Sequence, residues 1–94
     1  MMHSREQAET LALRCLEWLA GNDELLPVFM GSTGVNEDDM RERAGDPEFL
    51  ASILDFLLMD DTWVVGFCED NSLSFDVPMK ARTALPGGGV VNWT

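Results

Sequence analysis

Residues 46–58 carry hydrophobic side chains at the spacing of a helix that is covered on more than one side. On a helical wheel at about 100° per residue, the apolar positions span an arc of roughly 200°, whereas a surface helix needs only about 100°. These positions are Phe49, Leu50, Ile53, Leu54, Phe56, Leu57 and Leu58. The positions expected to face water are Glu48, Ala51, Ser52 and Asp55. The pattern therefore predicts a central core helix near residues 47–59.

The start of this helix is marked by residues that favour helix N-termini. Asp46 can accept a hydrogen bond from an amide of the first turn, and Pro47 suits the first helical position. Glu48 interacts favourably with the positive end of the helix dipole. The apolar arc is expected to pack against residues 8–19 and 63–68, with the last helix filling the remainder.

Similar patterns predict further short helices along the chain. Ser4 and Gln7 form a capping box at the start of the first one, which should end at Gly21. The second is expected to be broken by the Gly-Ser-Thr-Gly segment at residues 31–34. Within residues 62–70, Val64 and Val65 also suit a strand, but a strand without a partner would leave its backbone groups unpaired, so a helix is expected. The expected segments are residues 4–20, 25–30, 36–44, 62–70 and a last helix from Ser74 or Asp76 to Leu85.

The length of 94 residues suits one domain with a single modest core. The sequence predicts an all-α fold, in which five to six short helices form a compact single-domain bundle around the central helix. Residues 1–86 are expected to form this domain. Residues 87–94 begin with three glycines and are expected to be a flexible tail, whose Val91 and Trp93 could fold back onto the domain.

The charge of the chain is strongly acidic. Six basic residues stand against seventeen acidic ones, which gives a formal net charge of −11. Such a surface repels phosphate groups, so neither nucleic acid nor an anionic membrane is an expected partner. The charge is compatible with a basic protein partner, but a role in keeping a small protein soluble explains it more simply.

The chain shows no signal peptide and no run of about 20 apolar residues, which a membrane span requires. Cys15 and Cys68 lie in apolar stretches and are too few for a disulfide framework. A cytoplasmic protein with reduced core cysteines is therefore expected.

His3 is the only histidine and lies near the terminus, so it is not expected to act as a catalytic base or as a member of a catalytic triad. One histidine and two cysteines are also too few ligands for a zinc site. No cofactor is expected.

Two short motifs are compatible with binding chemistry. The GxxG spacing at residues 31–34 occurs in an RNA-binding fold, but acidic residues follow it here, so a turn with Gly34 in a left-handed conformation is the preferred interpretation. The acidic pairs Asp60–Asp61 and Glu69–Asp70 could hold a divalent cation. Neither pair fits the spacing of an EF-hand loop, and helix caps with a solvated face explain both pairs more simply.

Several groups of residues, spread over nearly the whole chain, together carry a family pattern. They are the apolar face of residues 8–19, Phe29 with Thr33–Gly34, Asp46–Pro47 with Phe49–Leu50, residues 54–57, Phe67, Ala81–Arg82 and residues 84–87. This pattern resembles a bacterial family of small proteins, the domain-of-unknown-function family number 3572. The resemblance implies no activity, cofactor or site residue, because the family has none assigned.

Two hypotheses of function remain. In the first, the chain is a small non-enzymatic protein–protein interaction domain, whose partner is an unknown protein or a second copy. Its apolar surplus beyond the inward stripe, above all Trp18, Val65 and Trp93, would form the interaction surface. In the second, the chain is a metal-dependent enzyme or accessory protein, and the four carboxylates of the acidic pairs converge in a cleft.

Overall fold

The structure is a computed structural model that describes residues 4–86. Every regular element in this part of the chain is a helix, so the all-α prediction is confirmed. The six helices are α1 (Arg5–Ala20), α2 (Leu25–Thr33), α3 (Glu37–Glu42), α4 (Pro47–Leu57), α5 (Asp61–Asp70) and α6 (Val77–Thr83).

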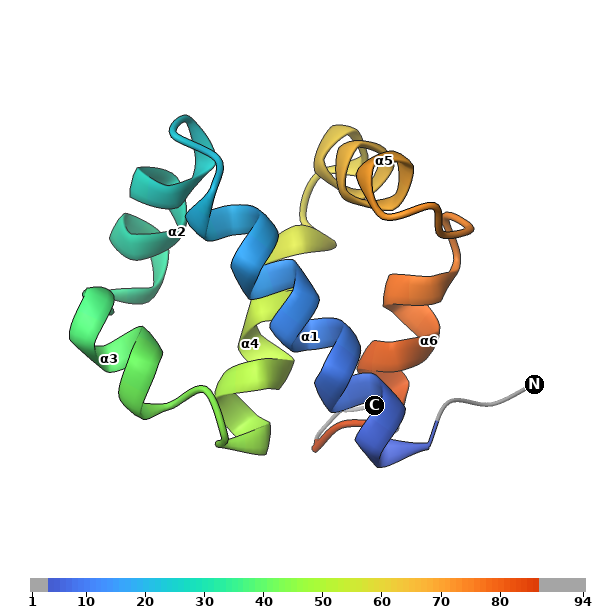
Figure 1. Ribbon diagram of the computed structural model, residues 1–94, viewed down its shortest axis with the longest axis horizontal. Coiled ribbons are helices and arrows are strands. Elements are labelled where there is room, and N and C mark those ends of the chain that lie inside the picture. Colours follow the sequence, from blue (N-terminus) through green and yellow to red (C-terminus); the bar gives the residue numbers. More distant parts are fainter. Residues whose placement is uncertain (1–3, 87–94) are drawn as a thin grey trace, which may run out of the picture.

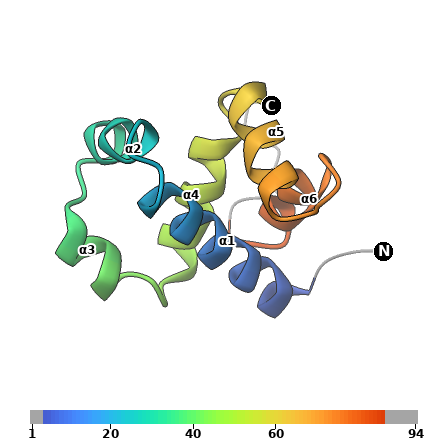
Figure 2. The same cartoon turned by 45° about the horizontal axis from the view of Figure 1, so that its top comes forward.

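Helices α1 and α4 cross at the middle of the molecule, and the other helices flank this pair (Figure 1). Helices α2 and α3 lie on one side, and α5 and α6 lie on the other (Figure 2). Helix α4 packs against α1, α5 and α6, while α1 also packs against α2 and α6. The predicted central helix is therefore confirmed, and α1 shares its central position.

Aromatic side chains connect the two flanks to α4. Phe29 of α2 packs edge-to-face against Phe56, with ring centroids 5.2 Å apart, and against Phe49 at 6.4 Å. On the other side of α4, Trp63 of α5 stacks on Phe56 at 4.7 Å. Such contacts add to the stabilisation from burial alone. Phe56 thus joins both halves of the molecule.

The helix starts agree with the capping residues expected from the sequence. The Ser4 side chain accepts a hydrogen bond from the backbone N–H of Gln7, which completes a capping box with the Gln7 side chain. Asn36, Asp46 and Asp60 cap α3, α4 and α5 through their side-chain oxygens. Asp60 and Asp46 are therefore occupied with local structural roles.

Several expected boundaries and faces were wrong. Helix α2 continues through residues 31–33 and ends only at Gly34, whose φ of 74° is left-handed. The Thr33 hydroxyl donates to the carbonyl of Phe29 at 2.7 Å within this last turn. Ala51 is buried, because α4 is covered on more sides than its apolar arc suggested. Leu58 is only half-buried, and α6 ends at Thr83, two residues before the expected Leu85.

Within residues 4–86, no helix is both long enough and apolar enough to cross a membrane. The predicted flexible tail at residues 87–94 lies outside the described residues.

Candidate functional site

Trp18, predicted as a surface residue, lies in the last turn of α1 and is half-buried against α5. Its ring packs edge-to-face on Phe67, with centroids 5.7 Å apart and an interplanar angle of 71°. A Cβ on Gly66 would lie 3.4 Å from Cζ2 of Trp18, so the indole rests close to the α5 backbone. The indole Nε1 donates a 2.7 Å hydrogen bond to Oδ2 of Asp70. Trp18 is therefore held on α5 by both an apolar and a polar contact.

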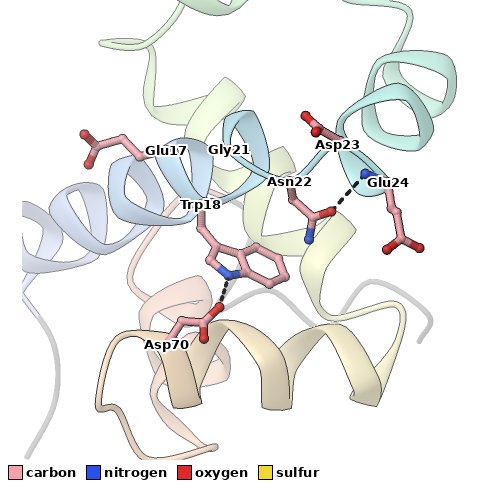
Figure 3. Close-up of a pocket in the computed structure, with 7 residues that line it drawn as sticks. All are labelled: Glu17, Trp18, Gly21, Asn22, Asp23, Glu24 and Asp70. Atoms are coloured by element: carbon pink, nitrogen blue, oxygen red, sulfur yellow. Dashed lines mark hydrogen bonds between the residues drawn. The ribbon is translucent and has the colours of Figure 1, made fainter.

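The Trp18 ring borders an open pocket of about 520 Å³, which we call the Trp18 pocket (Figure 3). The Asn22 side chain beside the ring accepts hydrogen bonds from the backbone amides of Glu24 at 3.0 Å and Leu25 at 3.1 Å. The carboxylate of Glu17 points away from the indole in Figure 3. The lining residues are Glu17, Trp18, Gly21, Asn22, Asp23, Glu24 and Asp70.

The Trp18 pocket is negative in potential. Four of its seven lining residues are acidic and none is basic. Helix α1 has no basic residue in its last turn, so the carbonyl end of its dipole adds to the acidic side chains. Arg14, one turn earlier, donates to Oδ1 of Asn71 at 3.2 Å and does not line the pocket. The aromatic face and the surrounding carboxylates together suit a cationic group.

The two predicted acidic pairs lie at opposite ends of α5. Asp60 and Asp61 begin the helix, and Glu69 and Asp70 end it, about 13 Å further along the axis at 1.5 Å per residue. Asp60 accepts a hydrogen bond from the backbone amide of Thr62 at 2.8 Å, and Asp70 accepts one from Trp18. No group of three or more potential metal ligands converges among residues 4–86.

Trp18, Val65 and Trp93 were expected to form one interaction surface. The structure does not bring Trp18 and Val65 together at one site. Val65 is 36% exposed, but it precedes Gly66 and so lies about 100° around α5 from the side that Trp18 contacts. Val65 does not line the Trp18 pocket. Trp93 lies outside the described residues. Of the two described residues, Trp18 lines the Trp18 pocket and Val65 does not.

A second hollow of about 420 Å³ lies on the other side of the last turns of α1, between α1, α2 and α3. We call it the α1–α3 groove. Glu17 borders both this groove and the Trp18 pocket. Sequence reasoning missed this groove, although the apolar residues of α1 are spaced to form its wall. Its lining residues are Leu16, Glu17, Ala20, Leu26, Glu37, Met40, Arg41 and Ala44.

The two cysteines are free and fully buried, as expected. Burial, with a smaller contribution from Cys68, raises the pKa of the Cys15 thiol from 9.0 to about 12. Burial, with a contribution from Asp76, also raises the pKa of Cys68, whose Sγ donates to the carbonyl of Ser74 at 3.5 Å. Both thiols are protonated at neutral pH and are not suited to act as nucleophiles.

A family model described as "Protein of unknown function (DUF3572)" matches residues 5–88. The chain belongs to this family. The resemblance seen in the sequence is thereby confirmed, and all six helices of the DUF3572 domain lie within the matched residues. No curated protein and no solved structure matches the chain.

Proposed function

We propose that this DUF3572 domain is a small non-enzymatic protein-interaction domain of the cytoplasm, with Trp18 as its main contact residue. One observation carries the proposal: a half-buried indole is held in place at the edge of an open pocket with an acidic lining. Tryptophan is enriched among the residues that dominate binding energy in protein interfaces. Because Asp70 and Phe67 already orient this ring, binding would cost little side-chain entropy.

The chemistry of the Trp18 pocket indicates what the partner presents. An arginine or lysine side chain could lie over the exposed part of the indole and pair with the carboxylates of Asp23 and Glu24. Charge complementarity of this kind also speeds encounter with a basic surface. The partner group is therefore a cationic side chain on a basic protein surface.

The metal-dependent enzyme has less support from the geometry. The acidic pairs that would form its site lie at the two ends of α5, and Asp60 and Asp70 already accept hydrogen bonds. The buried thiols offer no alternative nucleophile, because burial keeps them protonated. No observation on the described residues favours this second function.

The proposal is tested by affinity capture from the native cell with a charge-reversed pocket. The Asp23→Lys/Glu24→Lys double variant changes two exposed lining residues whose side chains hold no helix together. A matched control, Glu42→Lys/Glu48→Lys, makes the same charge change at exposed positions that line neither the Trp18 pocket nor the α1–α3 groove. Circular dichroism should show that both variants remain helical.

We expect a basic protein to be captured by the wild-type chain and the control, and to be lost with the pocket variant. If the wild-type chain captures no protein in a stoichiometric amount, the proposed function is wrong. It is also wrong if both variants capture the same proteins equally well, because the Trp18 pocket would then contribute nothing to recognition.

A further inference from the structure

The outer face of α1 carries an apolar stripe that continues the α1–α3 groove. Leu13, Leu16 and Ala20 follow the i, i+3, i+7 spacing that places side chains on one helix face. Leu13 is 38% exposed, Ala20 is exposed and Leu16 is half-buried. Across the groove, Leu26 and Met40 supply the facing apolar wall. The apolar stripe of α1 and the facing side chains of two other helices together form one apolar surface, and an amphipathic helix binds to surfaces of this kind.

Carboxylates surround this apolar surface. Glu17 and Glu37 line the groove, and Glu6 lies two turns before Leu13 on the same side of α1. None of these three carboxylates pairs with a basic side chain among residues 4–86. Arg41 is the only basic residue that lines the groove within the described residues. Acidic groups therefore outnumber basic ones around the apolar surface.

The charge around the groove favours a basic partner over a second copy of this chain as the group that covers it. A second copy of this chain would bring its own net charge of −11 to a surface that is already acidic, and such like-charge contacts are unfavourable. A partner with cationic groups beside its apolar side chains would neutralise the unpaired carboxylates. An amphipathic helix with a basic polar face has this arrangement, because apolar residues at i, i+3 and i+7 fill a groove while flanking lysines and arginines reach its rim.

We infer that the α1–α3 groove binds the apolar face of a basic amphipathic helix of the partner protein. This inference rests on the proposed function and names the structural class of the partner. Glu17 stands between the two hollows, so one segment can place apolar side chains in the groove and a cationic side chain in the Trp18 pocket.

The inference is tested with a synthetic helical peptide of about 15 residues, long enough to form several turns. Leucines occupy one face of the peptide, and lysines and arginines occupy the rest. A control peptide has the same composition but spreads its leucines around the helix. Binding is measured by fluorescence anisotropy of the labelled peptide, and its location by the amide shifts that the unlabelled peptide causes in the NMR spectrum of the chain.

A matched pair of variants separates the groove from general electrostatics. Ala20→Arg places a bulky cation in the groove at an exposed helical position, and Thr83→Arg adds the same charge at the exposed end of α6. We expect the amphipathic peptide to bind with a micromolar dissociation constant and to shift the amides of Leu13, Leu16 and Met40. Ala20→Arg should weaken this binding by about tenfold, as for a central interface residue, while Thr83→Arg should leave it nearly unchanged.

Three results would overturn the inference. They are equal binding of the two peptides, shifts that fall outside the groove, and a dimer of the chain alone that Ala20→Arg dissociates in analytical ultracentrifugation. The two proposals fail separately. If the peptide does not bind but the Asp23→Lys/Glu24→Lys variant still loses a captured protein, the interaction function stands and the helix-binding groove does not.

Discussion

Trp18 combines an apolar contact and a polar contact whose partners lie about fifty residues away in the sequence. Phe67 supports the ring from α5, and Asp70 accepts its indole N–H at 2.7 Å. A local sequence pattern shows that a tryptophan stands beside the inward stripe of α1, but it contains no information on which residue receives its N–H. The Trp18 pocket therefore depends on how α5 packs against α1, which the local sequence pattern does not specify.

The hydrogen bond can be separated from the packing by substitution. Trp18→Phe keeps an aromatic ring against Phe67 but removes the indole donor, and it should lower the free energy of unfolding by about 1 kcal/mol. Urea unfolding followed by circular dichroism measures this change. Asp70→Asn retains an oxygen acceptor and should cost clearly less. Equal losses in both variants would show that the charge of Asp70 matters more than its acceptor.

Cys15 gives the stability of the domain a pH dependence above neutrality. Its pKa is raised from 9.0 to about 12 in the folded state, so the folded chain keeps a proton that the unfolded chain releases. This contribution is fully present below pH 9 and is lost as the pH rises from 9.0 towards about 12. Over that range the free energy of unfolding should fall by up to about 1.4 kcal/mol per pH unit for this thiol.

The measurement is urea unfolding at several pH values between neutrality and about pH 11. The chain contains no tyrosine, so phenol ionisation does not obscure the result. Cys15→Ala should be less stable at neutral pH and should show a shallower decline, with the remaining slope due in part to Cys68, whose pKa is also raised. An identical slope in the variant would assign the decline to other groups.

At the scale of elements, the sequence predicted helix starts better than helix ends and exposed faces. Ser4, Asn36, Asp46 and Asp60 cap their helices through bonds that span only two or three residues, so local spacing was sufficient. The extension of α2 through Gly31 was not predictable from propensity, since glycine disfavours helices and the compensating contacts of Phe29 come from α4.

The α1–α3 groove shows the same limit of local reasoning. Leu16 belongs to the apolar face of residues 8–19 that was expected to point inward, but with Ala20 it lines the groove. The facing wall comes from Leu26 and Met40 in two other short helices. The distance between these walls depends on how α2 and α3 pack against the rest of the molecule. The spacing of apolar residues within α1 therefore does not predict the width of the groove.

Helix α5 carries acidic residues at both ends, and the helix dipole should give them opposite effects. Asp61 lies in the first turn, where a negative charge is favourable, and Glu69 lies in the last turn, where it is unfavourable. Both side chains are exposed. Glu69→Gln should raise the free energy of unfolding by about 0.3–1 kcal/mol at low salt, and Asp61→Asn should lower it by a similar amount.

Chemical unfolding in urea at low and high salt measures both changes. The two substitutions each remove one negative charge, so relief of general repulsion alone would stabilise both variants. Opposite signs would show that position along the helix decides the effect. Both differences should shrink in high salt, because surface electrostatics are screened there.

For the whole molecule, the net charge of −11 acts across its full width. The domain measures 32 × 26 × 26 Å, and at about 0.01 M ionic strength charges interact over about 30 Å. Nearly every carboxylate therefore repels every other one at low salt. Attractive ion pairs act only over short distances. One of them joins Arg82 Nε of α6 to Asp55 Oδ1 of α4 at 2.6 Å.

Added sodium chloride should consequently stabilise the domain, because it screens the self-repulsion of the compact state. Thermal unfolding followed by circular dichroism between about 0.01 M and 0.15 M salt, where the screening length falls from about 30 Å to 8 Å, measures the effect. The melting temperature should rise with salt. A falling melting temperature would show that ion pairs such as Arg82–Asp55 outweigh the repulsion.

The interior of the domain contains no buried polar or charged side chain among residues 4–86. An entirely apolar core accepts exchanges between hydrophobic residues of similar volume, whereas each helix cap needs an oxygen-bearing side chain at one position. Members of the DUF3572 family should therefore exchange hydrophobic residues of similar volume at the positions that the helices bury. At the positions of Asn36, Asp46 and Asp60, an alignment of many such chains should instead show only residues whose side-chain oxygen can cap a helix.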